Sequence, residues 1–230
     1  MRSVIYDNDQ PLARRFIANV EQPSFPCVGA KSALARGQMD ILVARDLRSA
    51  WDDLRILPAL TTTVAKYKVD RAIFRTLVVL FAGPDDLTED QFEHHLWARA
   101  QSLSDKDAWV GYRPDPSVSA DPDDPHFSLS FAGEAFFVVG LHPYASRPAR
   151  RFETPAMVFN LHDQFEVLRR EQRYEKLRAS ILQRDVALAG SVNPMLARHG
   201  ETSAARQYSG RQVGADWKCP FRRADTATGA

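Results

Sequence analysis

Two apolar segments near the middle of the chain constrain its fold more than any other feature. Residues 126–131 alternate between polar and apolar side chains, which is typical of a strand exposed on one face. Residues 135–141 are apolar throughout, which predicts a strand buried on both faces. Only three residues separate them, so the two segments predict an antiparallel hairpin within a sheet.

The segments around this hairpin show both helical and strand patterns. Asp46 is expected to cap a helix that stops at Pro58, with a second helix over residues 60–69. Thr88 and Gln91 form a capping box, in which each side chain bonds a backbone N–H at the start of a helix. Helices are also predicted over residues 11–20, 30–36 and 88–103, and strands over residues 39–44, 73–82 and 157–159.

One long helix is predicted in the last third of the chain. Asn160 would cap it, Asp163 would occupy the reciprocal capping position, and the helix would run to about Asp185. Glu166 lies one turn before Arg170 and is expected to pair with it. The apolar side of this helix would carry Phe165, Leu168, Leu177 and Ile181.

These mixed patterns predict the α+β class, with a mainly antiparallel sheet packed against helices. A length of 230 residues is within the range of one domain, so we assign residues 1–223 to a single domain. Residues 224–230 are expected to form a flexible C-terminal tail. Residues 111–125 hold four prolines and are expected to form a surface loop.

Composition and missing motifs exclude several classes of protein. No stretch approaches the ~20 apolar residues of a membrane span, and the start of the chain lacks the apolar block of a signal peptide. Two cysteines cannot build a disulfide framework, so we expect the reducing cytoplasm. The chain has no P-loop, no dinucleotide-binding glycine motif, no nucleophile elbow and no zinc-binding helix motif. A net charge of +1 and the lack of a reading motif argue against a nucleic-acid partner.

Charge is unevenly distributed along the chain. Residues 84–125 hold 11 acids against 3 bases, whereas residues 143–223 hold 15 bases against 8 acids, and 13 of these bases are arginines. Two solvated faces of opposite sign would account for this pattern. An arginine-lined pocket for an anionic ligand would account for it equally, because the planar guanidinium group suits carboxylate and phosphate.

Two histidines are candidate metal ligands. His142 directly follows the predicted buried strand and precedes an arginine-rich loop, whose cations would keep its ring neutral, the form that binds iron. His162 would take the second position of the long helix, where the helix dipole also favours the neutral ring. Asp163 or Glu166 could orient the second ring nitrogen of His162. The alternatives are structural: His142 would bond a turn, and His162 would lie exposed in the first helical turn.

Other candidate side chains have weaker support. His94 and His95 lie within a predicted amphipathic helix, and His199 is placed at a predicted helix end. Cys27 and Cys219 are each expected to be a buried thiol, with haem ligation by the thiolate as the alternative.

Short motifs along most of the chain resemble the YqcI/YcgG family. The resemblance runs from about Phe25 to Phe221, and the ordered series of motifs is more specific than any single one. The motifs are Phe25-Pro26-Cys27, Gly140-Leu141-His142-Pro143 with Ser146-Arg147, Phe159-Asn160-x-His162-x-Gln164-Phe165, Arg184-Asp185, Asn193-Pro194-Met195-Leu196, Gln207-Tyr208-Ser209-Gly210-Arg211 and Trp217-x-Cys219-Pro220-Phe221.

The resemblance implies a haem-dependent N-hydroxylase, since some members of that family hydroxylate the guanidine nitrogen of arginine or arginine-like compounds. It implies haem b as cofactor, O₂ or peroxide as co-substrate, a small-molecule substrate and an external electron donor. His162 or His142 would be the axial iron ligand. The oligomeric state stays open, with a homodimer as one alternative. The haem propionates or a substrate carboxylate would be held by Arg147, Arg150, Arg151 and Arg211, with Tyr208 beside them.

Alternatives stay open for the residue that would bind the substrate cation and for the function of the protein. Glu134, Glu153 and Glu201 are candidate acidic partners of a substrate guanidinium or amine. A non-catalytic haem carrier or sensor would use both His142 and His162 as iron ligands. A metal-free protein would instead bind an anionic metabolite through the arginine-rich loop.

Overall fold

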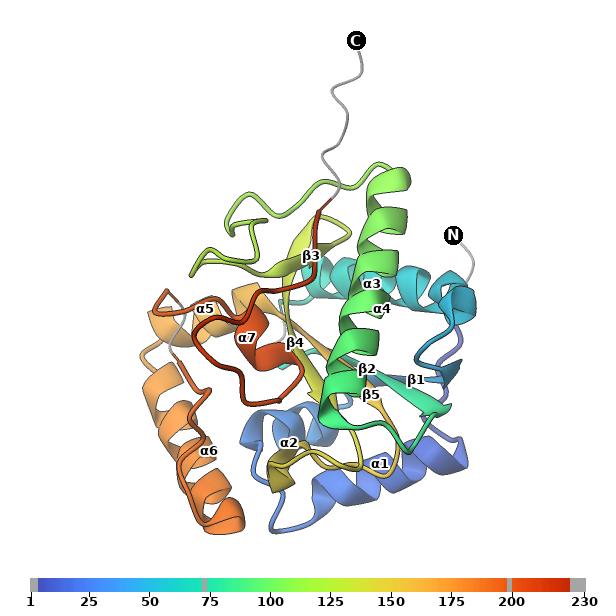
Figure 1. Ribbon diagram of the computed structural model, residues 1–230. Coiled ribbons are helices and arrows are strands. Elements are labelled where there is room, and N and C mark those ends of the chain that lie inside the picture. The colour runs from blue at the N-terminus through green and yellow to red at the C-terminus, as the bar shows by residue number, and fades with distance from the viewer. Residues whose placement is uncertain (1–3, 72–73, 198–199, 224–230) are drawn as a thin grey trace.

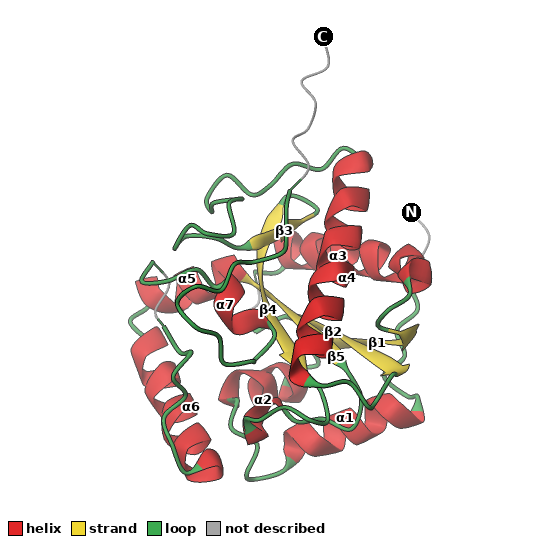
Figure 2. Cartoon of the chain, viewed as in Figure 1, coloured by secondary structure: helices red, strands yellow, loops and turns green. Residues whose placement is uncertain are grey.

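Within the described residues, 4–71, 74–197 and 200–223, a computed structural model of the protein shows a mixed five-stranded sheet with helices on both faces (Figure 1, Figure 2). In chain order the elements are α1 (Pro11–Glu21), α2 (Val28–Ala35), β1 (Met39–Asp46), the 3-10 helix η1 (Ala50–Asp52), α3 (Asp53–Val69), β2 (Thr76–Gly83), α4 (Glu89–Trp109), β3 (Leu129–Phe131), β4 (Glu134–Leu141), the 3-10 helix η2 (Pro148–Arg150), β5 (Ala156–Leu161), α5 (His162–Arg170), α6 (Tyr174–Ala189) and α7 (Ala205–Tyr208).

The strand order in the sheet is β1-β2-β5-β4-β3. β1 and β2 are parallel, with Met39 opposite Thr76, and α3 lies in the crossover that joins them. The other three pairs of neighbouring strands are antiparallel. The predicted α+β class is therefore confirmed. The assignment of residues 1–223 to one domain stays a prediction, and the predicted tail lies outside the described residues.

The side chains of β2 enter two different cores. Leu77, Val79 and Phe81 belong to the cluster that the sheet forms with α3 and α4. Val78 and Leu80 belong to the cluster that the sheet forms with α1 and α2. Both faces of the strand are buried, which explains why its sequence is apolar without alternation.

The predicted hairpin is present as β3 and β4, but its first strand is more buried and its second strand less completely buried than predicted. Ser128 and Ser130 of the first strand segment are buried rather than exposed, and the Ser130 hydroxyl accepts a hydrogen bond from the backbone N–H of Asp115 in the covering loop (3.1 Å). In β4, Phe137 and Val139 are only half-buried because they border a cavity.

Pro58 does not end a helix, contrary to the prediction. α3 continues through Pro58 to Val69, and Asp46 ends β1 instead of capping a helix. Proline has no N–H for the carbonyl group four residues earlier, which here belongs to Leu54. Leu54 is largely exposed, so the missing hydrogen bond lies near the solvent-facing side of the helix.

The single long helix predicted after Asn160 is two helices. Asn160 lies within β5, and α5 and α6 are separated by a turn in which Gln172 has a φ of 58°. Glu166 pairs with Arg169 rather than with Arg170. The turn allows α5 and α6 to form separate walls of the same cavity.

α4 begins as predicted and extends further than predicted. Thr88 and Gln91 form the capping box, and the helix runs beyond Leu103 to Trp109. Across the described parts of the chain, none of the helices combines the length and the apolar composition needed to cross a membrane. The cytoplasmic compartment stays a prediction.

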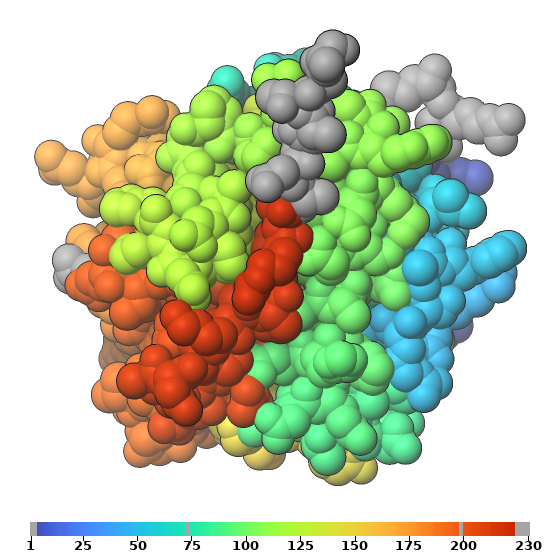
Figure 3. All heavy atoms as spheres, turned by 45° about the horizontal axis from the view of Figure 1, so that its top comes forward, coloured from blue at the N-terminus to red at the C-terminus, as the bar shows by residue number. Residues whose placement is uncertain are grey.

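The C-terminal segment packs against α4 and the neighbouring loop. Figure 3 shows this segment, in red, between the green surface of α4 and the yellow-green surface of the loop at residues 111–125. Glu93 on α4 is buried. Its carboxylate accepts hydrogen bonds from Ser209 Oγ (2.9 Å), Arg211 Nε (2.8 Å) and Trp217 Nε1 (3.3 Å). Because a buried carboxylate needs such partners, this cluster holds the segment on α4.

Gly140 in β4 is expected to tolerate no side chain. A Cβ atom there would lie 2.6 Å from Leu96 Cδ1, 2.8 Å from Phe92 Cε1 and 2.9 Å from the backbone oxygen of Tyr208. Gly140→Ala should therefore lower the free energy of unfolding by about 1–3 kcal/mol in urea denaturation. Gly29→Ala is the control, because its Cβ would lie no closer than 3.4 Å to a neighbouring atom. Equal stability of the two variants would refute this expectation.

Candidate functional site

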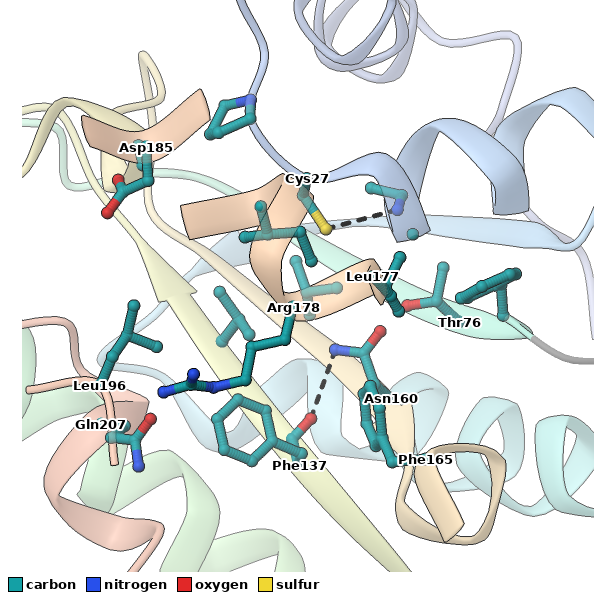
Figure 4. Close-up of a pocket in the computed structure, with 18 of the residues that line it drawn as sticks. Cys27, Thr76, Phe137, Asn160, Phe165, Leu177, Arg178, Asp185, Leu196 and Gln207 are labelled. Carbon is teal, nitrogen blue, oxygen red and sulfur yellow. Dashed lines mark hydrogen bonds between the residues drawn. The ribbon is translucent and has the colours of Figure 1, made fainter. Parts of the chain in front are cut away.

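The face of the sheet that packs against α1 and α2 also borders a cavity. The cavity has a volume of about 330 Å³ and lies between the sheet and helices α2, α5 and α6 (Figure 4). Val78, Val139 and Val158 line it from the sheet, and Ala30 and Ala33 line it from α2. A concave apolar site of this size suits a small molecule with a large hydrophobic surface.

Helix α6 lines this cavity with one continuous face. The lining positions are spaced three and four residues apart, as expected for one side of a helix. Arg178 and Asp185 are the charged members of this otherwise largely apolar face. The sequence prediction identified Leu177 and Ile181 but missed Arg178, although its spacing from them was a readable signal. The lining residues of α6 are Tyr174, Leu177, Arg178, Ile181, Leu182 and Asp185.

His162 is the candidate metal ligand that lies in the cavity wall. It directly follows β5 and is the first residue of α5, one position earlier than predicted. Its side chain is 10% exposed, and its Nε2 lies 3.2 Å from Oε1 of Glu166. Burial lowers the pKa of His162, while the Glu166 carboxylate acts in the opposite direction. Asp163, predicted as a capping or orienting group, instead accepts hydrogen bonds from Tyr67 and Arg71.

His142, the other candidate ligand, is not part of the cavity lining. It is 1% exposed, and its ring stacks on Phe92 with a centroid distance of 4.4 Å. Its Nδ1 atom is buried and has no hydrogen-bond partner among the residues that the structure describes. Burial lowers the pKa of His142 to about 4, with the Glu89 carboxylate opposing this shift. The ring is neutral near pH 7, as expected, but the cause is burial rather than the nearby arginines.

Of the remaining histidines, those that the structure describes belong to no cluster of three or more metal-binding side chains. His94 and His95 are neighbours on α4, with ring centroids 5.1 Å apart, and His199 lies outside the described residues. In the described ranges, no group of three or more His, Cys, Asp or Glu side chains is arranged to hold a metal ion. Haem iron requires only one or two protein ligands, because the porphyrin supplies the others.

Three of the predicted arginines have different positions relative to the cavity. Arg147 lines it and forms an ion pair with Asp185. Arg151 lies outside the lining, and its Nε donates a hydrogen bond to a backbone carbonyl of its own loop (2.7 Å). Arg211 also lies outside the lining, where it pairs with Glu93.

Arg150 lines the cavity while donating to backbone carbonyl groups. Its Nη1 donates to the oxygens of Gly140 (3.1 Å) and Tyr208 (3.4 Å), and its Nη2 donates to the oxygen of Gln207 (3.0 Å). Burial lowers the pKa of Arg150 to about 10, which leaves the guanidinium charged at neutral pH.

The predicted tyrosine and cysteines occupy three different environments. Tyr208 is buried outside the lining, and its hydroxyl donates to the backbone oxygen of Phe136 (3.1 Å). Cys219 is buried in the core beside α4, where burial raises the pKa of its thiol to about 12. Cys27 is half-buried in the cavity lining, and its Sγ accepts a hydrogen bond from the N–H of Ala30 (3.4 Å). Burial also raises the pKa of Cys27, which disfavours a thiolate ligand.

The acidic groups predicted to receive a substrate cation lie away from the cavity lining. Glu134 pairs with a lysine of α3, and Glu153 pairs with an arginine of α1. Glu201 is also absent from the lining. Within the part of the chain that the structure describes, Asp185 is the acidic side chain that lines the cavity.

Comparison with known proteins gives one family and one curated relative. The family model for YqcI/YcgG matches residues 15–222 of this chain. The uncharacterised protein YcgG of Bacillus subtilis (strain 168) is 29% identical over 136 residues, which cover 56% of this chain. The aligned region spans 51% of that relative, about half of its length. No solved structure matches the chain.

His142 is expected to make the protein less stable in mild acid. Its pKa is about 4 in the folded state and about 6.5 in an unfolded chain, so the unfolded chain binds more protons between these pH values. The free energy of unfolding should fall by up to about 3 kcal/mol as the pH decreases from about 6.5 to 4. Urea unfolding of His142→Phe, which keeps a ring against Phe92, should lack this contribution. The exposed control His94→Phe should retain it, and identical pH profiles for the native protein and His142→Phe would contradict the assignment.

Proposed function

The chain belongs to the YqcI/YcgG family, and from that premise we propose that it is a haem-dependent oxygenase. Its substrate would be a small arginine-like molecule, hydroxylated at a guanidine or amine nitrogen. The observation that carries the proposal is a neutral, largely buried His162 in the wall of an apolar cavity. Haem b, O₂ or peroxide, and an external electron donor would complete the reaction.

The residues of the cavity fit a haem group. The valines of the sheet and the alanines of α2 form walls that suit a flat apolar porphyrin. His162 offers the neutral imidazole that binds iron. Arg150 keeps a positive charge in the lining, which suits the carboxylate arms of haem. Cys27 also lines the cavity, but its raised pKa makes it the weaker ligand.

Haem would supply the oxygen chemistry, and the protein would supply binding, orientation and exclusion of water. His162 would hold the iron, and Glu166 would act on the orientation of its ring, since the two side chains are 3.2 Å apart. Asp185 would attract a guanidinium or amine of the substrate. Its carboxylate already pairs with the guanidinium of Arg147, so a substrate guanidinium would bind beside Arg147 or in its place.

The two alternative functions differ in their support from the geometry. A carrier or sensor with two histidine ligands is disfavoured, because His142 stacks on Phe92 outside the cavity lining. A protein that binds an anionic metabolite without haem retains support from the charge of Arg150. Binding of hemin and turnover of substrate distinguish these alternatives from the oxygenase.

Hemin titration tests the proposed ligand. The native protein should develop a Soret band at one hemin per chain. His162→Gly should weaken hemin binding at least about tenfold, because even the loss of a group that hydrogen-bonds a metal ligand lowers metal affinity by that much. Added imidazole should restore the band. His142→Phe and the exposed control His94→Phe should bind hemin as the native protein does. Absence of a Soret band from the native protein would overturn the proposed function, and unchanged binding by His162→Gly would overturn the ligand assignment.

A turnover experiment separates an oxygenase from a carrier. The hemin-loaded protein would be incubated with arginine and either a reductant with O₂ or peroxide alone. Mass spectrometry should detect a product that has gained one oxygen atom. Asp185→Asn should raise the KM for arginine more than it lowers kcat, because it removes a charge that binds the substrate. Hemin binding without any oxygenated product from amine or guanidine substrates would favour the carrier.

A further inference from the structure

The arginine side chains that line the cavity are only partly neutralised by the protein. Arg147 and Arg169 each form an ion pair with a nearby carboxylate. Arg150 and Arg178 also line the cavity, and neither forms an ion pair with any residue in the described ranges. The cavity lining therefore includes two arginines that form no ion pair with a described residue, although the Asp185 carboxylate also acts on the charge of Arg150.

Arg178 is oriented into the cavity. Its side chain leaves α6 and extends past Phe137 toward Leu196 and Gln207 (Figure 4). It is half-buried, and its guanidinium donates no hydrogen bond to any residue that the structure describes. A guanidinium has five N–H donors, and none of those of Arg178 is a buried atom without a partner, so they face the open space of the cavity. The arrangement therefore provides donors for an acceptor that lies outside the described protein.

Arg150 contributes the second charge from η2, which packs against α6. Its guanidinium donates to three carbonyl oxygens, which are dipoles and leave its full charge in place. Gln207 joins the two arginines, because its backbone oxygen accepts from Arg150 and its side chain lies near the end of Arg178 in Figure 4. An anion at Arg178 would thus also be attracted by Arg150.

We propose that Arg178, supported by the charge of Arg150, forms a subsite for a carboxylate group of the bound ligand. The inference rests on the proposed function, whose ligands carry carboxylates in two places: on the propionate arms of haem and on an arginine-like substrate. A guanidinium fork binds a carboxylate through two parallel hydrogen bonds, and such bonds are stronger in an apolar site. Asp185 would then receive the cationic end of a substrate, and Arg178 would receive an anionic group.

The first arm of the test uses hemin and its propionate diamide, which has no free carboxylates. If Arg178 binds a propionate, Arg178→Gln should weaken hemin binding about tenfold or more and leave diamide binding unchanged. The hemin affinity of Arg178→Lys should lie between that of the native protein and that of Arg178→Gln, because lysine keeps the charge but loses the planar fork of donors. Lys176→Gln is the matched control, since it removes a charge from the exposed face of the same helix.

The second arm uses arginine and agmatine, which share a guanidine group but differ in the carboxylate. If Arg178 binds the substrate carboxylate, the hemin-loaded protein should bind arginine at least about tenfold more tightly than agmatine by calorimetry. Arg178→Gln should abolish this preference, whereas Lys176→Gln should preserve it. Unchanged hemin binding together with loss of the arginine preference would assign the subsite to the substrate.

The results separate failure of the subsite from failure of the proposed function. If Arg178→Gln changes neither hemin binding nor the preference for arginine, the subsite is overturned and the haem protein stands. If the native protein binds no hemin, the proposed function is overturned. The second arm is then measured on the haem-free protein, where an arginine preference that depends on Arg178 would support the subsite and its absence would refute it.

Discussion

The cavity side of the structure depends on the hydrogen bonds that the Arg150 guanidinium donates to backbone carbonyl groups. The guanidinium bonds Gly140 at the end of β4 and both Gln207 and Tyr208 of α7, so it joins segments far apart in the sequence. Two glycines make room for this contact. A Cβ at Gly140 would lie 2.9 Å from the Tyr208 oxygen, and a Cβ at Gly210, whose φ is 85°, would lie 3.1 Å from Arg150 Cγ. Motifs that look separate in the sequence therefore form one packed unit.

The same C-terminal segment is held from its other side by a group of opposite charge. Glu93 accepts hydrogen bonds from Ser209 and Arg211, which follow α7 directly. The segment at residues 207–211 is thus fixed between a buried carboxylate on α4 and a guanidinium at the end of η2. This position places the Gln207 side chain in the cavity lining, so residues that contact no ligand determine where a lining residue lies.

The sequence predicted those features that depend on neighbouring residues and missed those that depend on tertiary contacts. The β3–β4 hairpin and the Thr88 capping box are local, and both are present. Pro58 was misjudged because α3 continues through it, with the residue one turn earlier, Leu54, on the exposed side of the helix. Asn160 was misjudged because pairing with β2 and β4 extends β5 past it. His162 was identified as a candidate, but only packing separates it from His142, which has the same chemistry and lies outside the cavity.

The walls of the cavity come from almost the whole length of the chain, from Phe16 in α1 to Gln207 in α7. During synthesis, α2 and the five strands are made before α6 and α7. Until then, the valines of the sheet that line the cavity would be exposed, and exposed hydrophobic surface makes partly folded chains aggregate. A ligand that needs all walls of the cavity can therefore bind only after α6 and α7 have been made.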